Sequence, residues 1–182
     1  MLGVVLAGGE GRRMGFDKAA LALGAEPLWS RQARVLREAG AERVLVARRR
    51  GQAPLQHPGV CLDVFSGSGP MAGLHAALSC GRRGWVAVLA VDMPAVDPRW
   101  FAWLRGFCGE GVGAAARHSL CIEPLAAIYP GESLGEVRLR LARRDLSMQR
   151  LVAALAASGR MRIVPLAAAS AGSAESLNAP RA

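Results

Sequence analysis

The sequence lacks several features that mark common classes of protein. Hydrophobic residues make up 52% of the chain, yet no apolar run approaches the roughly 18–20 residues that a membrane-spanning helix needs. No basic residue precedes the first apolar stretch, as one would in a signal peptide. The four cysteines form no Cys-x-x-Cys pair, which disfavours a zinc site or a disulfide framework. We therefore expect a cytoplasmic protein with reduced thiols and no membrane partner.

Lysine, asparagine and threonine are also scarce. Lys18 is the only lysine beside 22 arginines, Asn178 is the only asparagine, and threonine is absent. A lysine kept in such an arginine-rich sequence indicates a need for a compact ammonium group. The net charge of +9 fits nucleic acid, anionic lipid or a polyphosphate substrate. No aromatic residues interleave with the densest arginine run, Arg48–Arg50, so we interpret it as a solvated loop and expect no nucleic-acid partner.

Apolar runs alternate with helical segments along the chain. Strands are predicted at 3–6, 43–47, 60–63, 85–91, 113–116, 125–129 and 161–166, and helices at 27–39, 71–80, 98–106 and 146–157. This alternation predicts one α/β domain over residues 1–182, a Rossmann-like three-layer sandwich with a mostly parallel central sheet. Ligands of such folds bind at the carboxyl ends of the strands, so the loops after Leu6 and Val91 are expected to face the same crevice.

The segment from Leu6 to Lys18 carries the clearest functional pattern. Its four glycines permit tight bends and positive φ angles. Successive backbone N–H groups in such a loop form a site for anions. Arg12 or Arg13, together with Lys18, would add positive charge for a triphosphate. The pattern therefore predicts a phosphate-binding loop, with a generic glycine-rich turn as the alternative.

The spacing within this loop fits neither of two common nucleotide-binding motifs. In a G-x-G-x-x-G motif, a glycine would stand where this chain has Met14. In a P-loop, a serine or threonine would follow Lys18, and this chain has Ala19 there. The loop therefore belongs to another class of phosphate site.

The loop resembles the signature L-A-G-G-x-G-x-R-M-G…K of nucleotidyltransferases, which attach a nucleoside monophosphate to a phosphorylated acceptor. It is most similar to the version found in molybdenum cofactor guanylyltransferases. Four later segments resemble motifs of that family, in the same order: Gly69–Gly73 (G-P-L-A-G), Val91–Pro94 (D-x-P), Glu123–Tyr129 (P-L-x-A-L-Y) and Leu177–Pro180 (N-x-N-T-P). The resemblance implies a fold of the nucleotide-diphospho-sugar transferase type.

The resemblance also implies which residues form the site. It assigns nucleotide binding to Leu6, Ala7, Gly8, Gly9, Lys18, Asp63, Gly69, Asp92 and Asn178, and catalysis to Lys18, Arg12, Arg13 and Asp92. Asp92 would also bind Mg²⁺, because a carboxylate at the end of a buried strand is a suitable hard-oxygen ligand. Simple alternatives exist for three of these residues: a helix N-cap for Asp92, an ordinary strand-end carboxylate for Asp63 and local capping for Asn178.

The reaction that the resemblance implies joins two polyanionic substrates. GMP would pass from GTP to the phosphate of Mo-molybdopterin, giving the guanine dinucleotide cofactor and pyrophosphate. Molybdoenzyme apoproteins or cofactor chaperones would then receive the product. Ala47-Arg48-Arg49 stands where the family has N-x-N, so the preference for guanine rests on resemblance alone. Two alternatives stay open: a cytidylyltransferase acting on molybdopterin or another phosphorylated acceptor, and a non-catalytic adaptor that binds GTP or the pterin.

Overall fold

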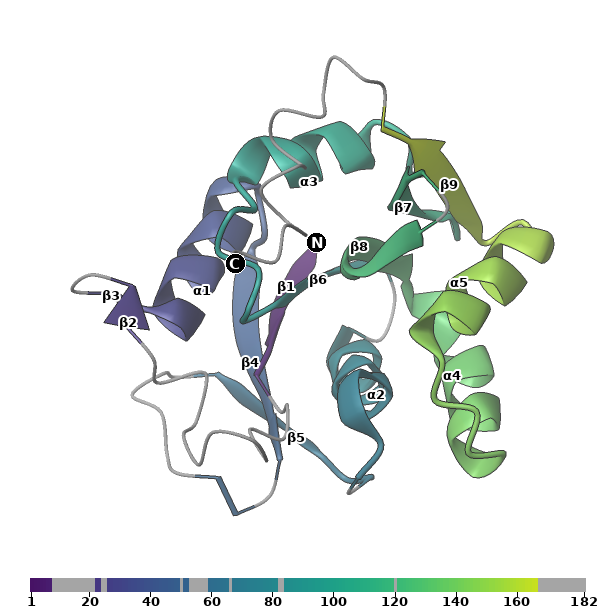
Figure 1. Ribbon diagram of the computed structural model, residues 1–182, viewed down its shortest axis with the longest axis horizontal. Coiled ribbons are helices and arrows are strands. Elements are labelled where there is room, and N and C mark those ends of the chain that lie inside the picture. Colours follow the sequence, from purple (N-terminus) through teal and green to yellow (C-terminus); the bar gives the residue numbers. More distant parts are fainter. Residues whose placement is uncertain are drawn as a thin grey trace.

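A seven-stranded sheet forms the centre of the molecule (Figure 1). The computed structural model describes residues 1–7, 22–23, 26–49, 51–52, 59–65, 67–81, 84–119 and 121–166. The strands of the sheet are β1 (Leu2–Leu6), β4 (Arg43–Arg49), β5 (Val60–Asp63), β6 (Trp85–Ala90), β7 (Gly113–His118), β8 (Cys121–Pro130) and β9 (Met161–Pro165). Their order is β5-β4-β1-β6-β8-β7-β9, and β2 (Ala22–Leu23) pairs separately with β3 (Glu26–Pro27).

The strands of this sheet run parallel with one exception. β1 pairs in parallel with β4 on one side and with β6 on the other, so that Leu6 lies between Ala47 and Ala90. β8 is antiparallel to both of its neighbours, β6 and β7. The predicted mostly parallel sheet is therefore confirmed, and the carboxyl end of β6 adjoins the amino end of β8.

Helices cover both faces of the sheet. They are α1 (Leu28–Glu38), α2 (Gly69–Gly81), α3 (Pro98–Arg105), α4 (Leu134–Ala142) and α5 (Met148–Ala157), with the short 3-10 helix η2 (Gly131–Ser133) before α4. α1 and α3 pack on one face, and α2, α4 and α5 on the other (Figure 1). This confirms the three-layer sandwich. None of the described helices is long and apolar enough to cross a bilayer.

Two apolar clusters hold these layers together. Leu36 and Phe101 are fully buried on the α1–α3 face, and Met71 and Leu151 on the opposite face. Each such side chain contributes about 1.5–3 kcal/mol relative to an exposed one. The rigid sheet that results fixes the positions of the loops at its carboxyl edge.

α4 is the helix that the sequence did not predict. In Val137–Leu141, apolar residues alternate with arginines, and a period of two is typical of a strand. In the structure only Val137 and Leu141 of α4 are buried. They lie four residues apart, which is the spacing of one helix face. The intervening Leu139 is exposed, and this exposure made the pattern misleading.

The prediction of a solvated loop at Arg48–Arg50 is wrong for the first two arginines. β4 continues to Arg49, because Arg48 and Arg49 pair with Leu62 and Asp63 of β5. The Arg48 side chain is consequently buried, with 3% of its surface exposed. Arg50 lies outside the described residues. Arg48 is therefore a buried arginine near the carboxyl end of β4, the strand next to β1.

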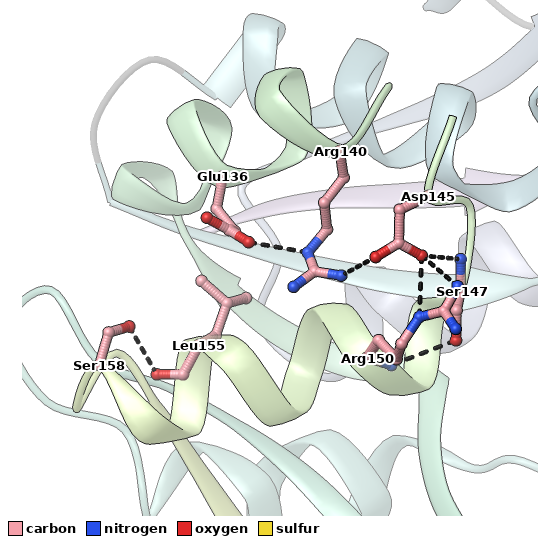
Figure 2. Close-up of polar contacts among 7 residues, drawn as sticks. All are labelled: Glu136, Arg140, Asp145, Ser147, Arg150, Leu155 and Ser158. Atoms are coloured by element: carbon pink, nitrogen blue, oxygen red, sulfur yellow. Dashed lines mark hydrogen bonds and ion pairs between the residues drawn. The ribbon is translucent and has the colours of Figure 1, made fainter. Parts of the chain in front are cut away.

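The junction between α4 and α5 is stabilised by charged side chains (Figure 2). Asp145 lies in the turn between the helices and accepts hydrogen bonds from Arg140 of α4 and Arg150 of α5. Glu136 accepts a second bond from Arg140 at 2.8 Å. Ser147 caps α5 by accepting from the Arg150 backbone N–H at 3.3 Å. These contacts fix the angle between the two helices.

Candidate active site

The carboxyl ends of β1 and β6 lie side by side. The Ala7 N–H donates to the Ala47 carbonyl at 3.0 Å, and the Val91 N–H donates to the Leu6 carbonyl at 3.1 Å. The chain moves from β1 outward through β4 to β5 and then returns to form β6 on the other side of β1. Such a reversal of strand order opens the crevice in which α/β sheets bind ligands. β1 and β6 therefore end at the same edge of the sheet. That the loops after Leu6 and Val91 face one crevice stays a prediction, because residues 8–21 lie outside the described residues.

Asp92 lies in a tight turn directly after β6 and is exposed. The turn has two steps, in which the Met93 N–H donates to the Ala90 carbonyl and the Val96 N–H donates to the Met93 carbonyl, at 3.3 and 3.2 Å. The N-cap of α3 is Asp97, whose carboxylate accepts from the Arg99 N–H at 2.8 Å. The alternative role of Asp92 as the cap of this helix is therefore wrong, and Asp92 lies at the carboxyl edge of the sheet.

Glu123 is the acidic neighbour of Asp92. The β6–β8 pairing ends at Leu89 and Ala126, and the charge of Asp92, which follows β6, acts on Glu123, three residues before Ala126. One Glu123 oxygen accepts from the Leu125 N–H at 3.0 Å. Burial raises the pKa of Glu123, the bond from Leu125 opposes this shift, and the charge of Asp92 raises the pKa further. The Asp92 and Glu123 carboxylates thus lie close enough for one charge to act on the other.

Glu123 belongs to one of the motifs found in the sequence, but no role in the site was predicted for it. An acidic residue at the start of a predicted strand was the available signal. That signal has meaning only once β8 is known to be antiparallel to β6, because a parallel strand would place its first residue at the opposite edge. Pairing partners of this kind are not specified by local sequence.

Asp63 lies at the same edge of the sheet but on the outermost strand. Asp63 is 6% exposed, and its carboxylate accepts from the Phe65 N–H at 3.0 Å. Burial raises the pKa of Asp63, while that bond and the charge of Arg49 lower it. Two strands, β4 and β1, separate β5 from β6, so the two strands are about 14 Å apart at interstrand spacings near 4.8 Å. The structure does not bring Asp63 and Asp92 together.

The amino end of α2 lies over the end of β1. A Cβ atom at Gly73 would come within 3.1 Å of Leu6 Cδ2, so glycine permits this close approach. Gly69 begins the helix with φ +55°, a left-handed conformation that favours glycine. The N–H groups of a helix amino end attract anions. The two glycines therefore allow a partly positive helix end to lie at the crevice.

Six of the predicted site residues lie outside the described residues: Gly8, Gly9, Arg12, Arg13, Lys18 and Asn178. Their roles stay predictions. Within the described part of the chain, no group of three or more His, Cys, Asp or Glu side chains could hold a metal ion. Asp92 and Glu123 are nevertheless hard oxygen donors of the kind that Mg²⁺ prefers, and it usually takes one or two carboxylates together with substrate phosphates.

This architecture is that of known nucleotidyltransferases. The molybdopterin-guanine dinucleotide biosynthesis protein A from Archaeoglobus fulgidus superposes with a TM-score of 0.66 and 23% identity, covering 97% of this chain and 88% of that chain. The 2-C-methyl-D-erythritol 4-phosphate cytidylyltransferase from Thermus thermophilus gives a TM-score of 0.64 and 20% identity, covering 92% of this chain and 89% of that chain. At these identities the similarity shows the fold.

Sequence similarity shows the family. The MobA-like NTP transferase domain matches residues 3–171, and the chain belongs to this family of nucleotidyltransferases. A protein from Opitutus terrae, named probable molybdenum cofactor guanylyltransferase, is 53% identical over 172 residues, covering 91% of this chain and 84% of that protein. The molybdenum cofactor guanylyltransferase of Pseudomonas putida is 31% identical over 164 residues, covering 86% and 84%.

Proposed function

We propose that this protein is a molybdenum cofactor guanylyltransferase, formed by one domain over residues 1–182. The observation that carries the proposal is the position of Asp92, which follows β6 next to the start of the loop after Leu6. A phosphate-binding loop and a metal-binding carboxylate at one switch point suit the transfer of a nucleotide. The close relatives that bear this name supply the substrate pair.

In the proposed reaction, a terminal phosphate oxygen of Mo-molybdopterin attacks the α-phosphorus of GTP. The new oxygen–phosphorus bond forms as the bond to the bridging α–β oxygen breaks, and pyrophosphate leaves with the electron pair. The attacking oxygen is already ionised near neutral pH, so no general base is needed. Catalysis consists of positioning the two substrates and neutralising charge on the phosphates.

Each predicted residue has a place in this scheme. The backbone of Leu6, Ala7, Gly8 and Gly9 contacts the nucleotide, and Arg12, Arg13 and Lys18 neutralise its phosphates. Asp92 would hold Mg²⁺, which would supply positive charge to the phosphates of the nucleotide. Asp63, Gly69 and Asn178 complete the nucleotide site.

The proposal includes a cytoplasmic location and further partners. Cys61, Cys80, Cys108 and Cys121 are all free thiols, as is usual for a reducing compartment. Molybdoenzyme apoproteins or cofactor chaperones would receive the product, and neither nucleic acid nor a membrane is required.

The experiment that tests this function compares two nucleotides. Purified protein with Mg²⁺ and Mo-molybdopterin is expected to release pyrophosphate with GTP and much less with CTP, measured by a coupled pyrophosphate assay. A preference for CTP would contradict the guanine assignment and identify a cytidylyltransferase. Measurable binding of GTP without turnover would instead support the adaptor. Lys18→Ala is the control for phosphate-dependent turnover.

A further inference from the structure

Gln32 of α1 is a fully buried polar side chain at the turn that carries Asp92. Its side-chain nitrogen Nε2 donates to the Met93 carbonyl at 2.7 Å and to the Ala90 carbonyl at 3.3 Å. These carbonyls are the two that begin the successive steps of the turn. One side-chain amide therefore bridges both steps, and Asp92 lies between the two bonded carbonyls in the chain.

Arg31, the preceding residue, contacts the same turn. Its Nε and Nη2 atoms both donate to the Pro94 carbonyl, at 3.1 and 2.8 Å. Arg31 and Gln32, here termed the α1 clamp, thus donate to carbonyl groups on both sides of Asp92. Hydrogen bonds from a charged donor are stronger than those between neutral groups, so the second contact reinforces the first.

The burial of Gln32 is costly for a residue with only a packing role. Its side-chain oxygen Oε1 is buried and has no hydrogen-bond partner among the described residues. A buried polar atom without a partner costs about 1–3 kcal/mol, and an apolar side chain of similar size would avoid that cost. The donor nitrogen is the part of the side chain that is used, and both of its acceptors belong to the Asp92 turn.

We propose that the α1 clamp positions Asp92 for the metal ion. This inference rests on the proposed function, in which the Asp92 carboxylate holds Mg²⁺. The position of Asp92 at the carboxyl edge of the sheet depends on the backbone of this turn. Gln32 and Arg31 hold that backbone from α1, the helix that follows the segment containing Lys18 in the chain. Both are positioning residues that act through Asp92.

The test measures metal affinity and needs no acceptor substrate. Mn²⁺ binding to the GTP complex is followed by electron paramagnetic resonance for the unsubstituted protein, Gln32→Met, Asp92→Asn and the double variant. Gln32→Met keeps the side-chain length but removes the donor, and we expect it to weaken Mn²⁺ binding about tenfold, the lower end for loss of a partner that orients a ligand. In the Asp92→Asn background, Gln32→Met is expected to cause no further loss.

Arg31 supplies a variant pair in which folding is not at issue, because its side chain is only half-buried. Arg31→Met should weaken Mn²⁺ binding severalfold, and Arg31→Lys should restore part of it by keeping one donor to the Pro94 carbonyl. Arg34→Met is the matched control, since Arg34 is exposed on the same helix and pairs with Glu26 and Glu38.

The outcomes separate the clamp from the role of Asp92. Weaker Mn²⁺ binding in Asp92→Asn but not in Gln32→Met and Arg31→Met would overturn the clamp and leave the proposed metal ligand in place. Equal losses from Gln32→Met with and without Asp92 would also overturn it, because the effect would not pass through that carboxylate. Unchanged binding in Asp92→Asn would refute both, whatever the pyrophosphate assay shows.

Discussion

Two regions of this molecule use carboxylates in opposite ways. At the α4–α5 junction, Asp145 lies between Arg140 and Arg150, and hydrogen bonds from Arg150 hold the pKa of Asp145 below its usual range (Figure 2). At the carboxyl edge of β6, Glu123 lies near Asp92, and burial together with that like charge raises the pKa of Glu123.

The difference teaches how a structural carboxylate can be told from a functional one. A carboxylate between two arginines is stabilised in its ionised form and contributes to folding. Two neighbouring carboxylates destabilise each other until a cation joins them. Perturbation of this second kind is more common at functional sites. Three substitutions test whether the two regions differ in this way.

The largest effect is expected from Asp92→Asn. Loss of the carboxylate that holds the metal should lower kcat for pyrophosphate release by about 10³-fold, as for other groups that neutralise transferring phosphates. Because Asp92 is exposed, the melting temperature should change by no more than about 2 °C. Steady-state kinetics and calorimetry measure the two quantities. Full activity in this variant would show that the carboxylate after β6 is not needed for catalysis, and the two regions would then not differ in function.

Asp145→Asn is expected to affect stability and leave turnover unchanged. The folded-state pKa of Asp145 is lowered, so its contribution is present above the unfolded-state pKa and is lost as the pH falls through the folded-state value. The variant should therefore melt about 1–3 °C lower at neutral pH, and the difference should shrink in acid. Calorimetry across a pH series checks this. If kcat fell and stability did not, Asp145 would be a functional carboxylate and not a structural one.

The smallest effect is expected from Glu123→Gln. Its effect on stability has the opposite sign to that of Asp145→Asn. The folded-state pKa of Glu123 is raised, so the ionised form costs folding free energy above that value and the cost disappears below the ordinary pKa of 4.5. Without metal, the variant should melt at the same or a slightly higher temperature at neutral pH. Its affinity for Mn²⁺ should fall severalfold. A marked loss of stability would instead make Glu123 a structural residue like Asp145.

Much of the fold could be predicted from local sequence. The strand at 60–63 and the helix at 27–39 were both predicted, because apolar runs and glycine caps are local features. Gly40, which follows this helix, adopts the left-handed conformation that favours glycine, with φ +91°. α4 was missed because an exposed leucine gave its apolar pattern the wrong period. β4 was predicted too short because pairing with β5, and not hydrophobicity, extends it to Arg49.

The site was predictable only in part. The aspartate after β6 was identified because a buried apolar run ends abruptly at Asp92. The α1 clamp and the neighbouring Glu123 depend on contacts between residues far apart in the chain. Gln32 and Met93, for example, are brought together by the packing of α1 on the sheet. Roles assigned to the loop at 8–21 and to Asn178 stay predictions, because those residues are outside the described part of the chain.

Because β8 is antiparallel to β6 and β7, the length of the β7–β8 hairpin affects which residue of β8 lies near Asp92. β8 returns from β7 through a short connection, and its pairing with β7 already shifts register between Ala114 and Ala116. A slip of one residue in a strand turns every side chain to the other face of the sheet. An insertion or deletion in this hairpin that slips β8 against β6 would therefore bring a residue other than Glu123 near Asp92. Divergence among related transferases could in this way change the surroundings of Asp92 without substituting any residue beside it.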